Sequence, residues 1–108
     1  MRQSKVRFKD QFNYIFCKLF FITAYLSIGD FNIIGVDWGA LCPSPLYFAA
    51  VENVRPVGEF LGQFIEFLVQ EAQANLNSFH VIGHSLGAQV AGLTGQSITS
   101  GQVQRITG

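Results

Sequence analysis

Charge is scarce in this chain of 108 residues. Only 13% of the residues are charged, and seven basic side chains balance seven acidic ones to a formal net charge of zero. A neutral chain has no bulk electrostatic attraction to nucleic acid or to an acidic membrane surface, so we expect no nucleic-acid partner. Hydrophobic residues make up 49% of the chain. A chain of this length buries one core, and the composition indicates further apolar surface that packs against neighbouring elements.

Cysteine and histidine are scarce as well. The two cysteines, Cys17 and Cys42, are too few to define a disulfide framework. Neither a metal-ligand spacing nor a glycine-rich phosphate loop occurs, so the sequence predicts no metal and no cofactor. The only histidines are His80 and His84, and none follows residue 84.

A strand-like run followed by a glycine-framed serine is the most informative segment. Residues 78–82 contain β-branched residues and favour a short strand, and residues 86–96 contain no proline and favour a helix. Between them lies the pentapeptide Gly83-His84-Ser85-Leu86-Gly87. A Gly-x-Ser-x-Gly sequence at a strand-to-helix turn is the setting in which a serine becomes a nucleophile.

The chemistry of such a turn explains its residue types. Ser85 needs an exposed hydroxyl, which requires a sparsely populated and strained backbone conformation. Side chains at Gly83 and Gly87 would collide with the adjoining strand and helix. The N–H of Leu86, at the positive end of the helix, is placed to donate to the oxyanion of a tetrahedral intermediate. The alternative is a tight glycine turn in which the Ser85 side chain only caps the helix.

The sequence pattern predicts alternating strands and helices, β-α-β-α-β, from about residue 31. Residues 31–37 are typical of a strand buried on both faces, and another strand begins at residue 103. A helix is expected from Ser44 as its N-cap and Pro45 to about Gln73, with Pro56 kinking or restarting it. Strands separated by helices pair in parallel, which predicts an α/β fold with its site at the carboxyl ends of the strands.

Four segments resemble, in order and with sensible spacing, the pancreatic-lipase-like family of α/β-hydrolases, and in particular its insect lipases and phospholipase A1-like members. They are residues 32–38, 51–58, 81–88 and 105–108. The resemblance implies a partial α/β-hydrolase domain over residues 24–108, a secreted protein, and hydrolysis of glycerolipid esters by a Ser-Asp-His triad. Two positions match the family's catalytic groups: Ser85 as the nucleophile and the Leu86 N–H as one oxyanion donor.

The rest of that catalytic machinery has no counterpart here. In the family, the stretch resembling Arg105 to Gly108 runs directly into the catalytic aspartate, and the catalytic histidine comes later. A His-Gly-aromatic turn supplies the second oxyanion donor before the segment resembling Ala24 to Asp30, yet this chain has no His-Gly pair. We therefore expect a fragment that carries the nucleophile and is inactive by itself.

Residues 1–23 do not fit the resemblance and are left unassigned. Four basic side chains precede an apolar stretch at residues 14–26, which fits a signal or anchor segment. The same residues fit an amphipathic helix with Phe8, Phe12, Phe16 and Leu19 on one side. Misread or displaced sequence is the third interpretation of this segment.

The remaining polar residues favour structural roles. His80 and His84 are expected to be packed or hydrogen-bonded, with His84 pointing away from Ser85, because this fold places its base after the acid in chain order. Asp37 either anchors a loop or serves the site. Arg55 is expected to pair with Glu52 or Glu59. Solvated helix positions are predicted for the four glutamates Glu52, Glu59, Glu66 and Glu71.

Three functions follow from these observations. The first is a serine hydrolase acting on a lipid ester, with contact to a lipid interface. The second is a non-catalytic storage or lipid-binding protein on the same fold, against which the intact serine turn counts. The third is a small membrane-associated protein that uses the Phe-rich N-terminus. No protein partner is predicted from the sequence.

Overall fold

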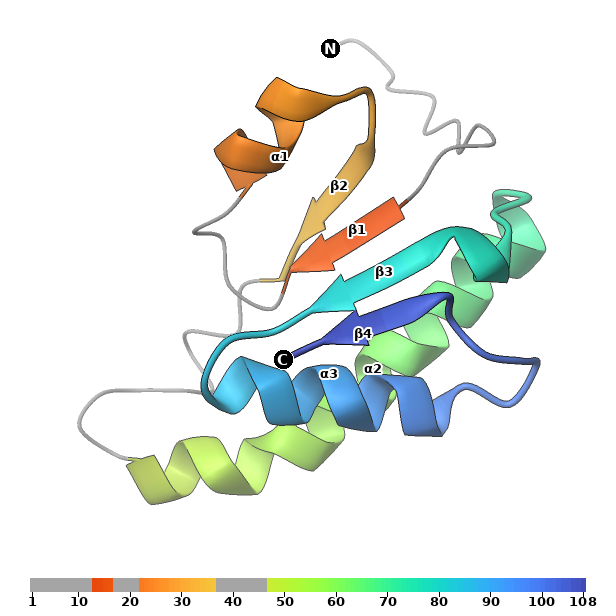
Figure 1. Ribbon diagram of the computed structural model, residues 1–108. Coiled ribbons are helices and arrows are strands. Elements are labelled where there is room, and N and C mark those ends of the chain that lie inside the picture. Colours follow the sequence, from red (N-terminus) through yellow and green to blue (C-terminus); the bar gives the residue numbers. More distant parts are fainter. Residues whose placement is uncertain (1–12, 17–21, 37–46) are drawn as a thin grey trace, which may run out of the picture.

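The computed structural model describes residues 13–16, 22–36 and 47–108, and Figure 1 shows their arrangement. Four strands, three α-helices and one short 3-10 helix form in this part of the chain. In order they are β1 (Asn13–Phe16), α1 (Ile22–Ile28), β2 (Asn32–Gly35), α2 (Tyr47–Glu71), the 3-10 helix Leu76–Ser78, β3 (Phe79–Ile82), α3 (Leu86–Ser97) and β4 (Arg105–Thr107). None of the described helices has the length and apolar content of a membrane span.

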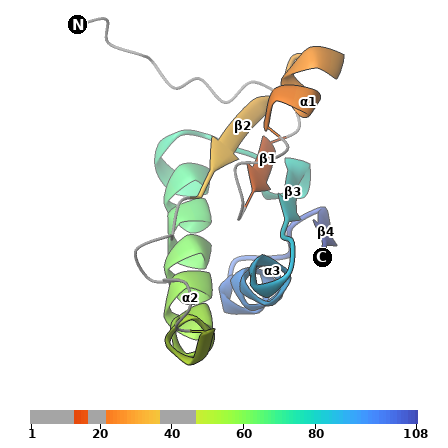
Figure 2. The same ribbon diagram turned by 90° about the vertical axis from the view of Figure 1, so that its left-hand side faces the viewer.

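The four strands form one parallel sheet in the order β2-β1-β3-β4. This confirms the predicted α/β fold and its β-α-β-α-β order from about residue 31. From β1 the chain crosses to β2 at one edge of the sheet. From β2 it returns in the opposite direction across the sheet, past β1, to β3. Accordingly α2 and α3 lie together on one face and α1 on the other (Figure 2). The order therefore reverses between β1 and β3, and the carboxyl ends of strands at such a reversal form binding sites.

Strand β1 lies inside the segment that the sequence left unassigned. Asn13–Phe16 pairs with β2 on one side and with β3 on the other, so it is a central strand of the sheet. Phe16 therefore belongs to a strand rather than to the amphipathic helix considered above. A short apolar run has no periodicity that separates a buried strand from a helix, which is why the sequence did not assign it.

Strand β2 is less buried than predicted. Its residues Asn32 to Ile34 are half-buried and Gly35 is exposed, whereas the apolar run predicted burial on both faces. The reason is the strand order, which puts β2 at an edge of the sheet. The predictions for Asp37 and for Ser44 and Pro45 fall outside the residues that the structure describes.

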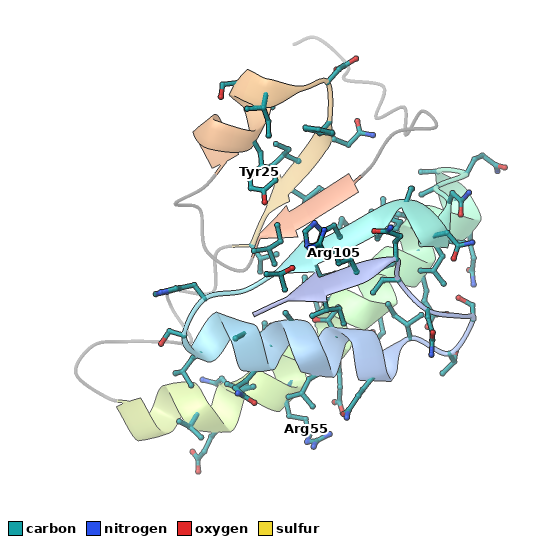
Figure 3. All side chains as sticks on the ribbon, viewed as in Figure 1. Tyr25, Arg55 and Arg105 are labelled. Atoms are coloured by element: carbon teal, nitrogen blue, oxygen red, sulfur yellow. The ribbon has the colours of Figure 1, made fainter. Side chains whose placement is uncertain are left out.

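Helix α2 continues through Pro56 as one element. Proline cannot donate a hydrogen bond to the carbonyl four residues earlier, which belongs to Glu52. Both residues are exposed, so water can satisfy that carbonyl and the helix need not restart. The predicted ion pair between Arg55 and Glu59 forms at 3.8 Å, and Arg55 points away from the sheet (Figure 3).

Helices α2 and α3 approach closely because two glycines face α3. A Cβ atom at Gly58 would lie 2.6 Å from the Leu93 Cβ, and one at Gly62 would overlap the Ser97 hydroxyl. Ser97 donates to the Thr94 carbonyl at 3.0 Å. The core between the helices and the sheet contains the fully buried side chains Ile65, Phe79, Val81, Val90 and Thr94.

Glu66 has a hydrogen-bonding role that the sequence did not predict, whereas Glu52, Glu59 and Glu71 are exposed as expected. Its exposed carboxylate accepts a hydrogen bond from the Thr99 backbone N–H at 3.3 Å and from the Thr99 hydroxyl. Hydrogen bonds from Ser100 first, and then from Thr99, lower the pKa of Glu66. This carboxylate fixes the loop that leads from α3 into β4.

Candidate functional site

The serine turn begins where β3 ends, at the reversal of strand order. Gly83 is its first residue, and the Gly83 N–H donates to the Thr107 carbonyl at 2.9 Å. The turn is therefore tied to the carboxyl end of β4. Ser85 follows two residues later and directly precedes α3.

The Ser85 backbone has the conformation that an exposed nucleophile requires. Its dihedral angles are φ 60° and ψ −124°. Only one other non-glycine residue in the described part of the chain, Gln73, has a positive φ. Such a conformation costs about 1–3 kcal/mol and persists only where the surrounding structure imposes it. The turn predicted from the Gly-x-Ser-x-Gly spacing is thus present and strained.

The Ser85 side chain does not cap helix α3. Ser85 occupies the N-cap position of α3, but it is exposed and its side chain makes no capping hydrogen bond. The backbone closes the turn instead, because Gly87 donates to the His84 carbonyl and Ala88 to the Ser85 carbonyl, both at 2.9 Å. The Leu86 N–H has no backbone acceptor among the described residues. Within the described ranges, the Ser85 hydroxyl and the Leu86 N–H therefore both remain available for hydrogen bonds.

Gly83 is required by the packing of the turn on itself. A Cβ atom there would overlap the carbonyl group of Gly87 and lie 2.7 Å from the Ala88 nitrogen. All of these atoms belong to the backbone, so no side-chain rotation could relieve the contact. Gly87 is itself buried.

The two histidines have different environments. His80 is 8% exposed, and its Nε2 lies 2.8 Å from the Thr107 hydroxyl oxygen, which confirms the expected packed and hydrogen-bonded histidine. His84 is exposed, so it is not packed, and no hydrogen bond of its ring is found among the described residues. The contact between His80 and Thr107 is a feature of the site that the sequence analysis missed, because 27 positions separate the two residues.

The described residues supply the serine turn and no complete triad. No hydrogen bond joins Ser85 to a histidine or a carboxylate within this part of the chain, and Asp37 lies outside it. No group of three or more His, Cys, Asp or Glu side chains among the described residues could hold a metal ion.

The profile of the family described as "Lipase" matches residues 10–108. The chain belongs to the Lipase family. The match begins before residue 24 and includes strand β1, so the family resemblance extends further toward the N-terminus than the four sequence segments indicated.

Curated relatives agree with this assignment. Lipase member H of Xenopus tropicalis is 38% identical over 87 residues, which is 81% of this chain and 18% of that protein. Phospholipase A1 member A of Rattus norvegicus is 42% identical over 92 residues, or 82% of this chain and 19% of that protein. Pancreatic triacylglycerol lipase of Myocastor coypus is 39% identical over 85 residues, or 79% and 18%. The chain thus spans about a fifth of the length of these lipases.

Two substitutions at Ser85 distinguish the energetic effect of backbone strain from that of helix capping in this segment of the Lipase family. Ser85→Ala should change the free energy of unfolding by less than about 0.5 kcal/mol, because the hydroxyl makes no hydrogen bond to any residue that the structure describes. Ser85→Gly should raise it by about 1 kcal/mol, since relief of about 1–3 kcal/mol of strain exceeds the entropic cost of glycine. Urea denaturation of the three proteins measures both changes. A loss of about 1 kcal/mol in Ser85→Ala, together with no gain in Ser85→Gly, would restore the capping interpretation.

His80 should make stability depend on pH. Burial first, and then the positive charge of Arg105, lower the pKa of His80. An unfolded histidine binds its proton near pH 6.5, above the folded pKa, so the unfolded state binds more protons as the pH falls through this range. The free energy of unfolding should therefore fall from about pH 7 toward pH 5, by at most about 1.4 kcal/mol per pH unit.

Denaturation curves at several pH values between 5 and 8 measure this dependence. His80→Gln should remove the decline, whereas His84→Gln, which replaces an exposed histidine, should keep it. The lowered pKa of Glu66 affects the free energy of unfolding only at more acidic pH. The stability that Glu66 contributes is lost as the pH falls below the ordinary carboxyl pKa near 4.3. An unchanged decline in His80→Gln would rule out His80 as its source.

Proposed function

We propose that Ser85 is the nucleophile of a carboxylic ester hydrolase that acts on glycerolipids. The observation that carries this proposal is the strained backbone of Ser85 together with its exposed and uncapped hydroxyl. A serine that merely ended a turn would gain stability by relaxing or by capping the helix, and Ser85 does neither. Its place at the reversal of strand order also favours a binding site.

The proposed reaction is acyl transfer through the serine. The Ser85 hydroxyl oxygen attacks the ester carbonyl while a histidine takes its proton, and the alcohol leaves after that histidine returns the proton to it. The oxygen of the tetrahedral intermediate accepts a hydrogen bond from the Leu86 N–H, a contact whose loss costs about 2.7–4 kcal/mol of barrier in such sites. Water then hydrolyses the acyl-enzyme and regenerates Ser85.

The acid and the base of this reaction lie outside the described turn. In hydrolases of this fold the order along the chain is serine, then acid, then histidine, and no histidine follows Ser85 in these 108 residues. We therefore propose that the 108-residue chain alone turns over no ester. In a protein that carries this segment with its triad partners, Ser85 performs the chemistry.

The substrate class is a triacylglycerol or a phospholipid. The names of the relatives include a triacylglycerol lipase and a phospholipase A1, and the turn itself does not favour one ester over the other. We also propose that the whole protein is secreted and works at a lipid interface, as expected from the family resemblance.

A fluorophosphonate probe tests the proposal, because it reacts covalently with activated serines. We expect labelling of Ser85 in a protein that carries this segment with its acid and base, and no labelling after Ser85→Ala. The 108-residue chain should remain unlabelled. Labelling that persists in Ser85→Ala, or no labelling of the larger protein, would contradict the nucleophile assignment; strong Ser85-dependent labelling of the 108-residue chain would contradict its inactivity. An unlabelled protein that still binds lipid would support the non-catalytic function instead.

A further inference from the structure

His80 lies on the face of the sheet that α2 and α3 do not cover. Its neighbours Phe79 and Val81 are fully buried in the core beneath β3. Successive side chains of a strand point to opposite faces, so His80 points to the face on which α1 lies (Figure 2). It is nevertheless only 8% exposed. A buried polar ring on a sheet face requires hydrogen-bond partners, and one of them is Thr107.

Thr107 makes hydrogen bonds with both its side chain and its backbone. Its hydroxyl oxygen lies 2.8 Å from the His80 Nε2, and its carbonyl accepts the Gly83 N–H at 2.9 Å. In the strand register His80 pairs with Arg105, and Ile82 pairs with Thr107. Arg105 is labelled on β4 in Figure 3. The side-chain contact therefore crosses diagonally toward the carboxyl end of β4, where the serine turn begins.

The position of Gly83 determines the position of the residues that follow it in the turn, because they pack directly on it. The backbone of Gly87 and Ala88 packs so closely on Gly83 that no Cβ atom fits between them. A Cβ atom at Gly108, directly after β4, would likewise lie 2.8 Å from the Ala88 Cβ. A shift of Thr107 would therefore move both the Gly83 N–H and the first turn of α3, where Ser85 and Leu86 lie.

We propose that His80 is a positioning residue for the serine turn, and that it acts through the Thr107 hydroxyl to fix the end of β4 against Gly83. The contact does not touch substrate or the reacting atoms. It sets the place of the Ser85 hydroxyl and of the Leu86 N–H through the backbone. The effect on catalysis rests on the proposed function, whereas the effect on the turn does not.

Thr107 offers the cleaner pair of variants, because His80 has interactions besides this contact. Thr107→Val keeps the shape of the side chain and removes its hydroxyl, while Thr107→Ser keeps the hydroxyl. Thr107 is exposed, so both variants should fold. Two measurements test the proposal: NMR-detected hydrogen exchange of the Gly83 amide in the 108-residue chain, and the rate at which a fluorophosphonate labels Ser85 in the larger protein that carries the triad partners.

We expect the Gly83 amide to exchange about tenfold faster in Thr107→Val and less than about twofold faster in Thr107→Ser, as for loss of one hydrogen bond. The rate of Ser85 labelling should fall about ten- to hundredfold in Thr107→Val and stay near wild type in Thr107→Ser. His80→Phe, which also removes the other interactions of His80, should have at least the effect of Thr107→Val, and the double variant should be no worse than His80→Phe.

Unchanged Gly83 exchange in Thr107→Val, or equal effects of the serine and valine variants, would overturn the proposal. Additive effects in the double variant would also overturn it, because the two residues would then act separately. If the larger protein with an unchanged segment is not labelled at all, the proposed function fails while the Gly83 exchange still tests the positioning. If labelling is normal and exchange does not respond to Thr107→Val, the positioning fails and the proposed function stands.

Discussion

Replacing Gly83 with alanine should lower the free energy of unfolding by at least about 3 kcal/mol, because the new Cβ atom has no space. It would overlap the Gly87 carbonyl group and lie 2.7 Å from the Ala88 nitrogen. Relief requires moving the start of α3, whose Val90 and Ala91 are fully buried against the core. The close packing of the interior resists that movement. Chemical denaturation measures the loss, and the same variant should lose fluorophosphonate labelling at Ser85 in the larger protein.

Gly92→Ala, within helix α3, is the matched control. Gly92 is exposed, and a Cβ atom there would meet nothing within 4 Å. Alanine in place of glycine in a helix interior should raise the free energy of unfolding by about 0.5–1 kcal/mol. The two glycine substitutions should therefore have opposite signs. A small loss in Gly83→Ala, similar to the change in Gly92→Ala, would show that the turn is not packed as described.

The serine turn could be predicted from the sequence because its determinants are local. Two glycines, a serine and the flanking strand and helix patterns lie within about twenty residues, and the strand and helix formed close to their predicted bounds, at Phe79–Ile82 and Leu86–Ser97. The pattern favoured an exposed Ser85 hydroxyl but left open a side chain that caps the helix. A serine before a helix is a preferred cap, and the structure shows an exposed Ser85 whose side chain makes no capping hydrogen bond.

Contacts between distant parts of the chain were beyond sequence reasoning. Glu66 looked like a solvated helix position, yet its partner Thr99 lies 33 residues away. The same limit applies to His80 and Thr107, which the parallel register brings together across two strands. The edge position of β2 and the central position of β1 depend on the strand order, which no local pattern encodes. The predicted elements were therefore more reliable than the predicted environments of their side chains.

The strained serine turn depends on a core that holds both of its ends. Positive-φ strain at Ser85 persists only if the surrounding structure outweighs it. Strand β3 holds one end through Phe79 and Val81, and helix α3 holds the other through Val90 and Ala91. Weakening that core should therefore release the turn before it affects exposed parts of the described chain.

Phe79→Ala should be the most damaging core substitution in the described chain, lowering the free energy of unfolding by about 3–5 kcal/mol. Phe79 is among the largest fully buried side chains and begins the strand that leads to Ser85. It belongs to the same core cluster as Ile65 of α2 and Ala91 of α3, so its removal leaves a cavity where both helices meet the sheet. Because the whole stability of a domain is about 5–15 kcal/mol, this loss should populate unfolded protein at ambient temperature.

Phe60→Ala controls for the general effect of removing a phenylalanine. Phe60 is 69% exposed on α2, and alanine is the stronger helix former, so the free energy of unfolding should change by less than about 0.5 kcal/mol. Urea midpoints and near-ultraviolet circular dichroism of both variants measure the contrast. Similar losses in the two variants would mean that Phe79 does not anchor a packed core, and the strain at Ser85 would then lack the support that the structure assigns to it.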